Sequence, residues 1–216
     1  VSMNIGMRGD PDKISVIPTS PGIVFQDLLI IGNEVSELYG AEPGYIRAYS
    51  IKSGKLEWTF HTVPKPGQFG YETWPKDAWK YVGGANNWGG MSLDEKRGMV
   101  FFATGSPTYD YYGKDRIGEN LFGNSVVALD AKTGKYKWHF QTVHHDLWDY
   151  DLPAPPNLIT VVHNGKKLML LPRLPNLDIS IPLTAIQVNR SSRSKNVRFR
   201  LLISPGSRPG QHSLSR

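Results

Sequence analysis

An all-β fold is the class that the sequence predicts, and two observations carry that prediction. The 216 residues include 22 Gly and 16 Pro, and 11% are aromatic, which is typical of short strands joined by turns. In addition, one strand–turn–strand pattern occurs twice. Repeated hairpins of this kind are typical of sheets stacked radially around an axis. The sequence therefore predicts part of a β-propeller, and a sandwich with coincidentally similar hairpins is the alternative.

The first predicted strands lie between Gly22 and Gly32. Two apolar runs flank the polar pair Gln26-Asp27, where the chain can turn, and Gly32 ends the second run. Their apolar character predicts buried strands.

The repeated hairpin runs from Ile46 to Trp58 and returns from Val127 to Trp138. Superposition pairs the following residues of the two copies: Ala48 with Ala128, Gly54 with Gly134, and Trp58 with Trp138. The small Ala lets neighbouring sheets approach, the Gly fixes the turn, and the Trp ring can lie between sheets. Each copy would therefore close one four-stranded blade.

A long insertion, His61–Gly84, separates the two hairpins and is too long for a simple turn, so it is a candidate functional loop. It leads to Trp88, which has glycines close by on both sides and could present its flat face to a planar ligand. From spacing alone, a Trp in this position packs in the protein core more often than it contacts a ligand. Further on, Met99–Thr108 reads as a buried strand that runs into a polar end, where Ser106 and Thr108 could supply site oxygens.

The segment from His144 to Pro153 concentrates groups that can transfer protons. Two imidazoles and three carboxylates lie within eight positions, with Trp148 and Tyr150 between them. An active-site wall is one interpretation, and a polar loop with an aromatic plug is the other. Because His144 and His145 are adjacent, a strand would point them to opposite faces, which favours structural hydrogen bonding over a shared metal.

Charge is distributed unevenly along the chain. From Leu168 onward, eight basic residues accompany one acidic residue, whereas the preceding part has 17 basic and 18 acidic residues. All six Trp and all ten Tyr also precede Leu168. There is no Cys, which excludes disulfides and thiolate metal sites. No apolar run is long enough to span a bilayer, and the N-terminus has no signal-peptide layout.

Taken together, these motifs resemble the pyrroloquinoline-quinone (PQQ) dehydrogenases, and the glucose dehydrogenase branch in particular. The resemblance rests on the order of four segments, which are Asn87-Trp88-Gly89, Phe102-Ala103-Thr104-Gly105, the Ala128 to Trp138 repeat, and Gln141 to Asp149. It covers about Pro18 to Lys167, which would be a few blades of the family's eight-bladed propeller. The domain prediction is accordingly 1–167 as partial propeller and 168–216 as a non-native basic tail.

The resemblance also implies a site. Asp149 matches the family's catalytic base, and Trp88 matches the ring that stacks on the cofactor. Glu37 matches a carboxylate ligand of Ca²⁺ or Mg²⁺, although a lone Glu here is otherwise more often a solvated surface acid. Where the family has Asn or Thr beside the metal, this chain has Ser106 and Thr108, and we expect Ser106 at the metal and Thr108 at the cofactor.

The implied function is the oxidation of glucose or a related sugar or alcohol, with PQQ and a hard cation as cofactors and a quinone or cytochrome as electron acceptor. The resemblance implies a periplasmic location. The chain alone is expected to be poorly stable and inactive, because a terminal blade needs a neighbour to cover its apolar face. The first competing function is a non-catalytic propeller module that binds a partner.

The second competing function treats the basic tail as a nucleic-acid arm. We expect instead that the tail is disordered and is read out of frame, and so binds no nucleic acid. Permitted codons for Met169–Asn176, read in a shifted frame, can spell Asp-Ala-Val-Ala-Gln-Val-Thr-Lys. Ile186–Phe199 can likewise spell a Thr-Gly-Lys turn in the same frame, and both stretches resemble the family's continuation. If the frame is shifted, a cofactor-contacting Lys of the family is missing from this chain.

Overall fold

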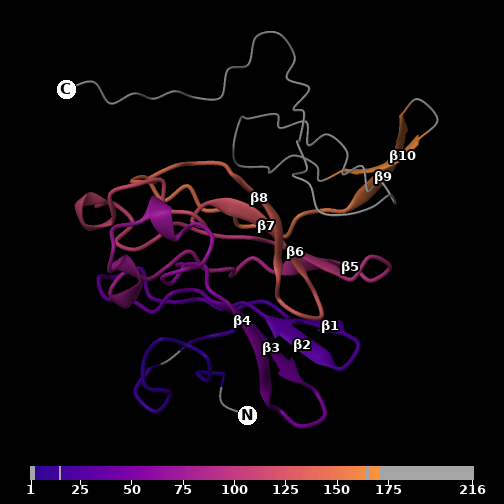
Figure 1. Cartoon of the computed structure of the whole chain (residues 1–216), viewed down its shortest axis with the longest axis horizontal. Helices are drawn as coiled ribbons and strands as arrows, with labels where there is room; N and C mark the ends of the chain where they lie inside the picture. The colour runs from indigo at the N-terminus through magenta and orange to yellow at the C-terminus, as the bar shows by residue number, and fades with distance from the viewer. Residues whose placement is uncertain (1–2, 15, 164–165, 171–216) are drawn as a thin grey trace. The chain divides into compact units, whose positions relative to one another are not determined.

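The computed structural model describes residues 3–14, 16–163 and 166–170, with side chains described as far as 158. These residues form ten strands and three short 3-10 helices, and no α-helix occurs among them. Eight of the strands build two four-stranded antiparallel sheets, each a simple meander in chain order (Figure 1). Two such sheets, one after the other, are the blades of a partial β-propeller, so the predicted all-β class is confirmed.

The first sheet has the strand order β1-β2-β3-β4. Its strands are β1 (Ile23–Phe25), β2 (Leu28–Ile31), β3 (Ile46–Ser50) and β4 (Leu56–Phe60). Gln26 and Asp27 form the predicted first turn, and Gln26 takes a left-handed φ of 54°. Burial is less complete than the sequence predicted, because β1 is an edge strand whose Val24 is 54% exposed.

The second sheet repeats this order as β5-β6-β7-β8. Its strands are β5 (Met91–Asp94), β6 (Met99–Ala103), β7 (Ser125–Asp130) and β8 (Tyr136–Gln141). The predicted buried strand is β6, in which every residue after Met99 is buried. Polar residues follow β6, as expected, and they lead into the site.

The two predicted repeats are equivalent in register. Ala48 pairs with Trp58 across β3 and β4, and Ala128 pairs with Trp138 across β7 and β8. Each pair is followed by an irregularity of the same kind, directly after the Ala. The repeat inferred from sequence therefore corresponds to one structural unit that is used twice.

The Gly of each repeat closes the hairpin. Gly54 and Gly134 have φ of 69° and 67°, in the left-handed region that favours glycine. Their N–H groups donate to Ser50 and Asp130 at 2.7 and 2.8 Å. A Cβ built on Gly134 would lie 2.5 Å from Cε3 of Trp58, so the ring of the first sheet packs on the turn of the second. The predicted position of this Trp between sheets is confirmed.

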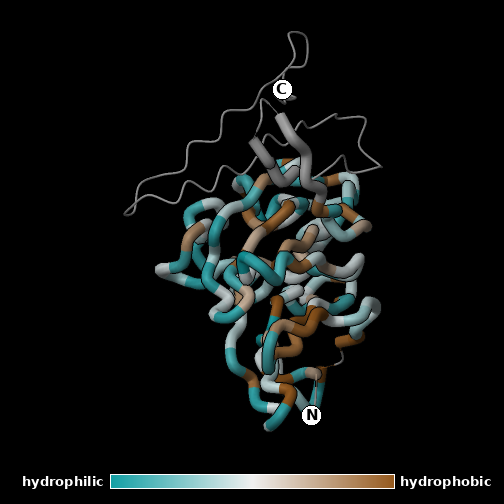
Figure 2. Tube along the Cα trace, turned by 90° about the vertical axis from the view of Figure 1, so that its right-hand side faces the viewer, coloured by the Kyte–Doolittle hydropathy of each residue, from teal (hydrophilic) through white to brown (hydrophobic). Residues whose placement is uncertain are grey.

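The main hydrophobic core lies between the sheets. It contains the following buried side chains: Phe25, Ile30, Ile46, Ala48, Phe60, Val100, Phe102, Leu121, Phe122, Val127, Leu129 and Ala131. Along the chain, apolar and polar stretches alternate over short lengths, as brown and teal segments in Figure 2 show. This alternation is what half-buried strands and polar turns produce.

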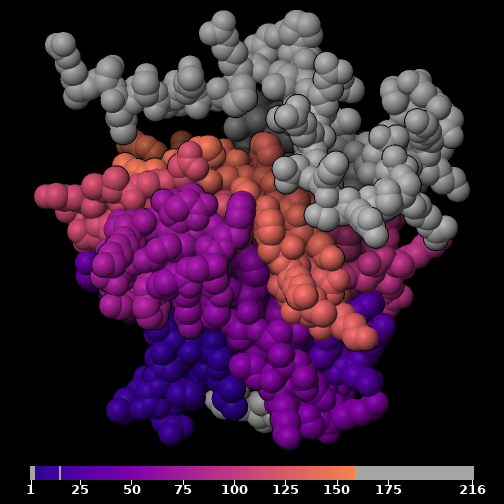
Figure 3. Space-filling model, viewed as in Figure 1, coloured from indigo at the N-terminus to yellow at the C-terminus, as the bar shows by residue number. Residues whose placement is uncertain are grey.

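The insertion between β4 and β5 is compact. It contains two 3-10 helices, η1 (Tyr71–Thr73) and η2 (Ala78–Lys80), and forms a large part of one face in Figure 3, where it is purple. A second buried cluster joins the insertion to Tyr45, the residue before β3, and contains Tyr45, Val63, Trp74, Ala78, Val82 and Ala85. The indole N–H of Trp74 donates to the Leu121 carbonyl, which ties the insertion to the loop between η3 (Lys114–Arg116) and β7.

The chain divides into two units after Pro156. The second unit contains β9 (Ile159–His163) and β10 (Lys166–Leu170), which pair antiparallel with each other. The predicted change at Lys167 falls within β10, and residues 171–216 of the predicted tail lie outside the described residues. No helix in the described ranges has the length and apolar character needed to cross a membrane.

Candidate active site

The site is built where the loops of the two sheets meet. Gly84, at the end of the insertion, forms isolated β-bridges with two residues. These are Pro43, in the loop between β2 and β3, and Pro107, in the loop after β6. Beside these segments lies a cavity of about 340 Å³. Its wall includes all five residues that the sequence singled out: Glu37, Trp88, Ser106, Thr108 and Asp149. The structure thus brings together residues spread over more than half the chain.

Asp149 is held by the carboxylate of Asp146. The backbone N–H groups on either side of Asp149, those of Trp148 and Tyr150, donate to this carboxylate at 3.0 and 2.7 Å. Between them Asp149 takes a left-handed φ of 58°. The 2%-exposed Asp146 is fixed in turn by the Ser106 hydroxyl at 2.6 Å. This turn presents the Asp149 carboxyl group to the cavity.

The environment of Asp149 favours a carboxyl group that can hold a proton near neutral pH. Burial raises its pKa to about 6, and the negative charges of Asp151 and Glu37 act in the same direction. A carboxylate with a pKa in this range accepts a proton more readily than an ordinary surface carboxylate. The arrangement is therefore suited to a general base.

Trp88 has a fixed ring orientation. Its indole Nε1 donates to Asp151 Oδ2 at 2.7 Å, and the other oxygen of that carboxylate accepts the Ser106 backbone N–H at 2.6 Å. A Cβ on Gly105 would lie 2.5 Å from Asp151 Oδ1, so glycine is required for this close approach. Trp88 is half-buried and lines the cavity, where a planar ligand could contact it.

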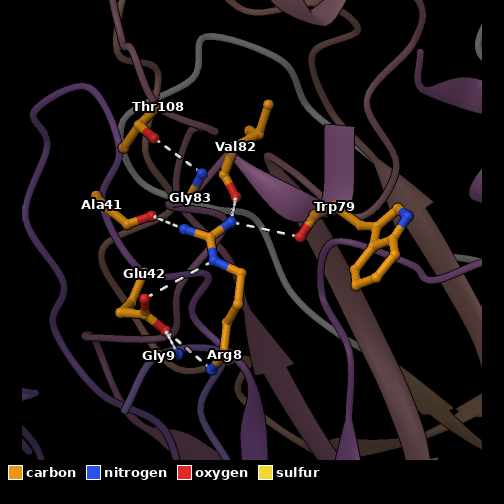
Figure 4. A network of polar contacts seen from close by, with 8 residues as sticks. All are labelled: Arg8, Gly9, Ala41, Glu42, Trp79, Val82, Gly83 and Thr108. Atoms are coloured by element: carbon orange, nitrogen blue, oxygen red, sulfur yellow. Dashed lines mark hydrogen bonds and ion pairs between the residues drawn. The ribbon is translucent and has the colours of Figure 1, made fainter. Parts of the chain in front are cut away.

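Thr108 is anchored to the end of the insertion. Its hydroxyl accepts the Gly83 N–H at 3.0 Å, and the Thr108 N–H donates to the Gly83 carbonyl at 3.1 Å. Arg8 supports this segment, because its guanidinium donates to the carbonyls of Val82 at 2.7 Å and Ala41 at 2.5 Å (Figure 4). The N-terminal segment thus braces the cavity wall.

The remaining two predicted residues differ in their surroundings. Glu37 is exposed on the loop after β2, although it lines the cavity. Ser106 is 4% exposed, and its hydroxyl both donates to Asp146 and accepts from Asn124 at 3.0 Å. One lone pair of this oxygen is left for a further contact.

The cavity suits a hard cation. Its ligand atoms are oxygens, the type that Ca²⁺ and Mg²⁺ prefer, and a cation would relieve the like-charge repulsion that raises the pKa of Asp149. Within the described part of the chain, however, no group of three or more His, Asp or Glu side chains could hold a metal by itself. A bound ion would need further ligands, including oxygens of a cofactor.

Sequence reasoning missed three carboxylates that organise the site. Asp146 and Asp151 were noted only as members of the acidic stretch, and Asp110 was not singled out. Asp110 also lines the cavity and is 3% exposed. Burial, together with the negative charges of Asp149 and Glu37, raises its pKa to about 7. Its position two residues after Thr108 was the available signal.

The two histidines of the acidic stretch do not lie on a strand. β8 ends at Gln141, and His145 takes a φ of 49° in the irregular segment that follows. The strand argument for their opposite orientation was therefore wrong. His145 Nδ1 lies 3.0 Å from the Gly118 carbonyl, which can only accept a hydrogen bond, so the expected structural role agrees with the geometry.

Comparison with known proteins identifies the family. A model of the PQQ glucose/ethanol/alcohol dehydrogenase β-propeller domain matches residues 1–172. Quinoprotein glucose dehydrogenase A of Acinetobacter calcoaceticus is 39% identical over 148 residues, which are 67% of this chain and 18% of that protein. Quinate/shikimate dehydrogenase (quinone) of Acinetobacter baylyi is 37% identical over 150 residues, which are 68% of this chain and 18% of that protein.

Solved structures agree with this result. Quinohemoprotein alcohol dehydrogenase from Comamonas testosteroni superposes with a TM-score of 0.59 at 33% identity, over 68% of this chain and 24% of that one. A europium-containing methanol dehydrogenase gives the same TM-score, 0.59, at 26% identity, over 69% of this chain and 29% of that chain. The chain spans about a fifth of the length of the curated relatives it matches. It belongs to the family of PQQ-dependent quinoprotein dehydrogenases, which includes glucose and alcohol dehydrogenases.

Proposed function

We propose that this segment forms part of the active site of a dehydrogenase that oxidises the CH–OH group of glucose or a related sugar or alcohol. One observation carries the proposal. Asp149, with a pKa of about 6, and Trp88, with its indole N–H fixed, line the same cavity. A propeller that served only as a scaffold would need neither feature at this place.

The side chains have distinct tasks in this proposal. Asp149 takes the proton of the substrate hydroxyl, while bound PQQ with its cation supplies the acceptor for the hydride. Trp88 supports the cofactor plane with its ring face, and Thr108 contacts the cofactor from the adjacent loop. Glu37 and Ser106 contribute oxygen ligands to Ca²⁺ or Mg²⁺.

The proposal extends to the whole protein through its relatives. The names of the relatives include quinone-linked and cytochrome-linked enzymes, such as the lupanine 17-hydroxylase [cytochrome c] of a Pseudomonas species. We therefore propose a quinone or a cytochrome as electron acceptor and the periplasm as location. Glucose is the leading substrate because the glucose dehydrogenase of Acinetobacter calcoaceticus is 39% identical.

The alternative is a non-catalytic propeller module that binds a partner. In a module of this kind, replacement of Trp88 would leave PQQ retention unchanged. A chimaeric dehydrogenase can separate the two functions: residues 16–158 of this chain replace the matching segment of the Acinetobacter calcoaceticus enzyme. We refer to this protein as the chimaera.

The test measures PQQ retention and sugar oxidation by the chimaera. The chimaera should oxidise glucose only when PQQ and Ca²⁺ are supplied, and Trp88→Ala should weaken PQQ retention by roughly 1–3 kcal/mol, as for stacked bases. Trp148→Ala is the matched control, because Trp148 is 73% exposed and does not line the cavity. Equal PQQ affinity in both variants and the parent would contradict the stacking role.

A further inference from the structure

Asp110 is the one buried carboxylate of the cavity wall that the proposed chemistry leaves without a task and that no described hydrogen bond or ion pair engages; Glu34, which also lines the cavity, is exposed to solvent. Asp110 is 3% exposed, and it lines the cavity that Asp149 also lines. Asp151, in contrast, accepts two short hydrogen bonds, from Trp88 and Ser106. Asp110 therefore presents acceptor oxygens toward the cavity with no protein donor assigned to them.

The position of Asp110 relative to Asp149 is fixed by Arg116. This guanidinium is 1% exposed and donates from one nitrogen to two carbonyl oxygens, those of Tyr109 at 3.2 Å and Asp146 at 2.5 Å. Tyr109 precedes Asp110 directly, and Asp146 begins the turn that holds Asp149. Arg116 thus joins the two loops that carry the two carboxyl groups.

Arg116 does not neutralise Asp110 by an ion pair. Its other terminal nitrogen donates to Asn120 Oδ1 at 2.9 Å, so both terminal nitrogens are engaged elsewhere. Its charge lowers the pKa of Asp110, yet burial and the charges of Asp149 and Glu37 have the larger opposite effect. A buried carboxyl group without a hydrogen-bond donor carries a free-energy cost. A ligand that supplies the donor removes this cost and therefore binds more tightly.

Asp149 and Asp110 line the same cavity, and Asp149 is the charge that affects the pKa of Asp110 most, so a ligand with two neighbouring hydroxyl groups can satisfy both. Asp149 is proposed to take the proton of the reacting hydroxyl. A sugar or another polyol carries a second hydroxyl on the adjacent carbon, whereas a simple alcohol does not. The second hydroxyl group would supply the donor that Asp110 lacks.

We propose that Asp110 accepts a hydrogen bond from the hydroxyl adjacent to the reacting one and thereby makes the site selective for vicinal diols such as sugars. This assignment rests on the proposed function and adds a specificity-determining residue to it. A charge-assisted hydrogen bond of this kind is worth about a 10- to 100-fold change in kcat/KM.

The experiment compares glucose with 2-deoxyglucose, which lacks the hydroxyl next to the reacting carbon, in the PQQ-loaded chimaera. Asp110→Ala should lower kcat/KM for glucose by about 10- to 100-fold and leave that for 2-deoxyglucose within about threefold. Asp110→Asn, which keeps the shape and one acceptor, should fall between the parent and Asp110→Ala. Asp115→Ala, in the following 3-10 helix η3 and outside the cavity wall, serves as the control.

Three outcomes overturn the assignment. An equal loss of kcat/KM for both sugars would show that Asp110 does not accept a hydrogen bond from the second hydroxyl group. Loss of Ca²⁺ or PQQ retention in both Asp110 variants would place this carboxylate at the cation instead. A parent chimaera that retains PQQ but oxidises neither sugar would overturn the proposed function itself, and this outcome is distinguishable because it needs no variant.

Discussion

Replacing Asp151 by Asn tests how the site is held together, because this carboxylate has two opposing effects. It accepts hydrogen bonds from Trp88 Nε1 at 2.7 Å and from the Ser106 N–H at 2.6 Å. An Asn side chain has one acceptor and one donor group, so one of the two N–H donors would face another donor. At the same time, Asp151 is the acid that raises the pKa of Asp149 most after burial.

The two effects predict a stability change that depends on pH. Loss of a hydrogen bond to a charged acceptor costs about 1.5–3 kcal/mol. At pH 5, Asp149 and Asp110 are largely protonated, since their pKa values are about 6 and about 7. Removing the Asp151 charge then relieves little repulsion. At pH 8 both carboxyl groups are ionised and the relief offsets part of the loss, so Asp151→Asn should destabilise more at pH 5 than at pH 8.

The same variant should lower the pKa of Asp149. With one negative charge removed, ionisation of Asp149 becomes less unfavourable, and its pKa moves from about 6 part of the way toward 3.8. The assays are urea denaturation at both pH values and carbon-13 NMR titration of the Asp carboxyl groups in cation-free protein. Asp27→Asn is the control, because Asp27 pairs with Lys52 on an exposed turn. An unchanged or higher pKa of Asp149 in the variant would refute the reasoning.

Two further predictions concern the fold and the tail. Gly134→Ala should destabilise the protein by about 2–5 kcal/mol, since it adds a left-handed Ala and a collision with Trp58, whereas Gly67→Ala, with φ 83° and nothing within 4 Å, should cost only about 1–2 kcal/mol. Equal midpoints in urea denaturation of the two variants would contradict the packing of Trp58 on the turn. For the tail, the nucleotide sequence after Lys167 should spell the family's continuation in a shifted frame, and codons that cannot do so would support the basic-arm interpretation.

The fold could be predicted because its signal is local and repeated. Ala, Gly and Trp recur at fixed spacing, and the structure gives them one register in both sheets. The depth of burial could not be predicted in the same way. Val24 has the apolar character of a core residue, but it lies on an edge strand and is exposed.

The site was predicted in part. The crowded proton-transfer groups and the Gly-flanked ring draw attention to Asp149 and Trp88, but the family resemblance is what assigns their roles. The residues that position them do not stand out, because their partners are distant: Trp88 and Asp151 are 63 positions apart, and Ser106 and Asp146 are 40 apart. Asp110 is marked in the sequence only by its position two residues after Thr108, and its burial, which a single sequence does not reveal, is what sets it apart from a surface acid.

We propose that Asp149 is the base of a PQQ-dependent oxidation in this cavity. The most direct test mixes glucose anaerobically with the oxidised, PQQ-loaded chimaera and follows the cofactor absorbance during a single turnover. Asp149→Asn should retain PQQ and reduce it about 10²–10⁴-fold more slowly than the parent. A rate close to that of the parent, with PQQ fully bound, would contradict the claim.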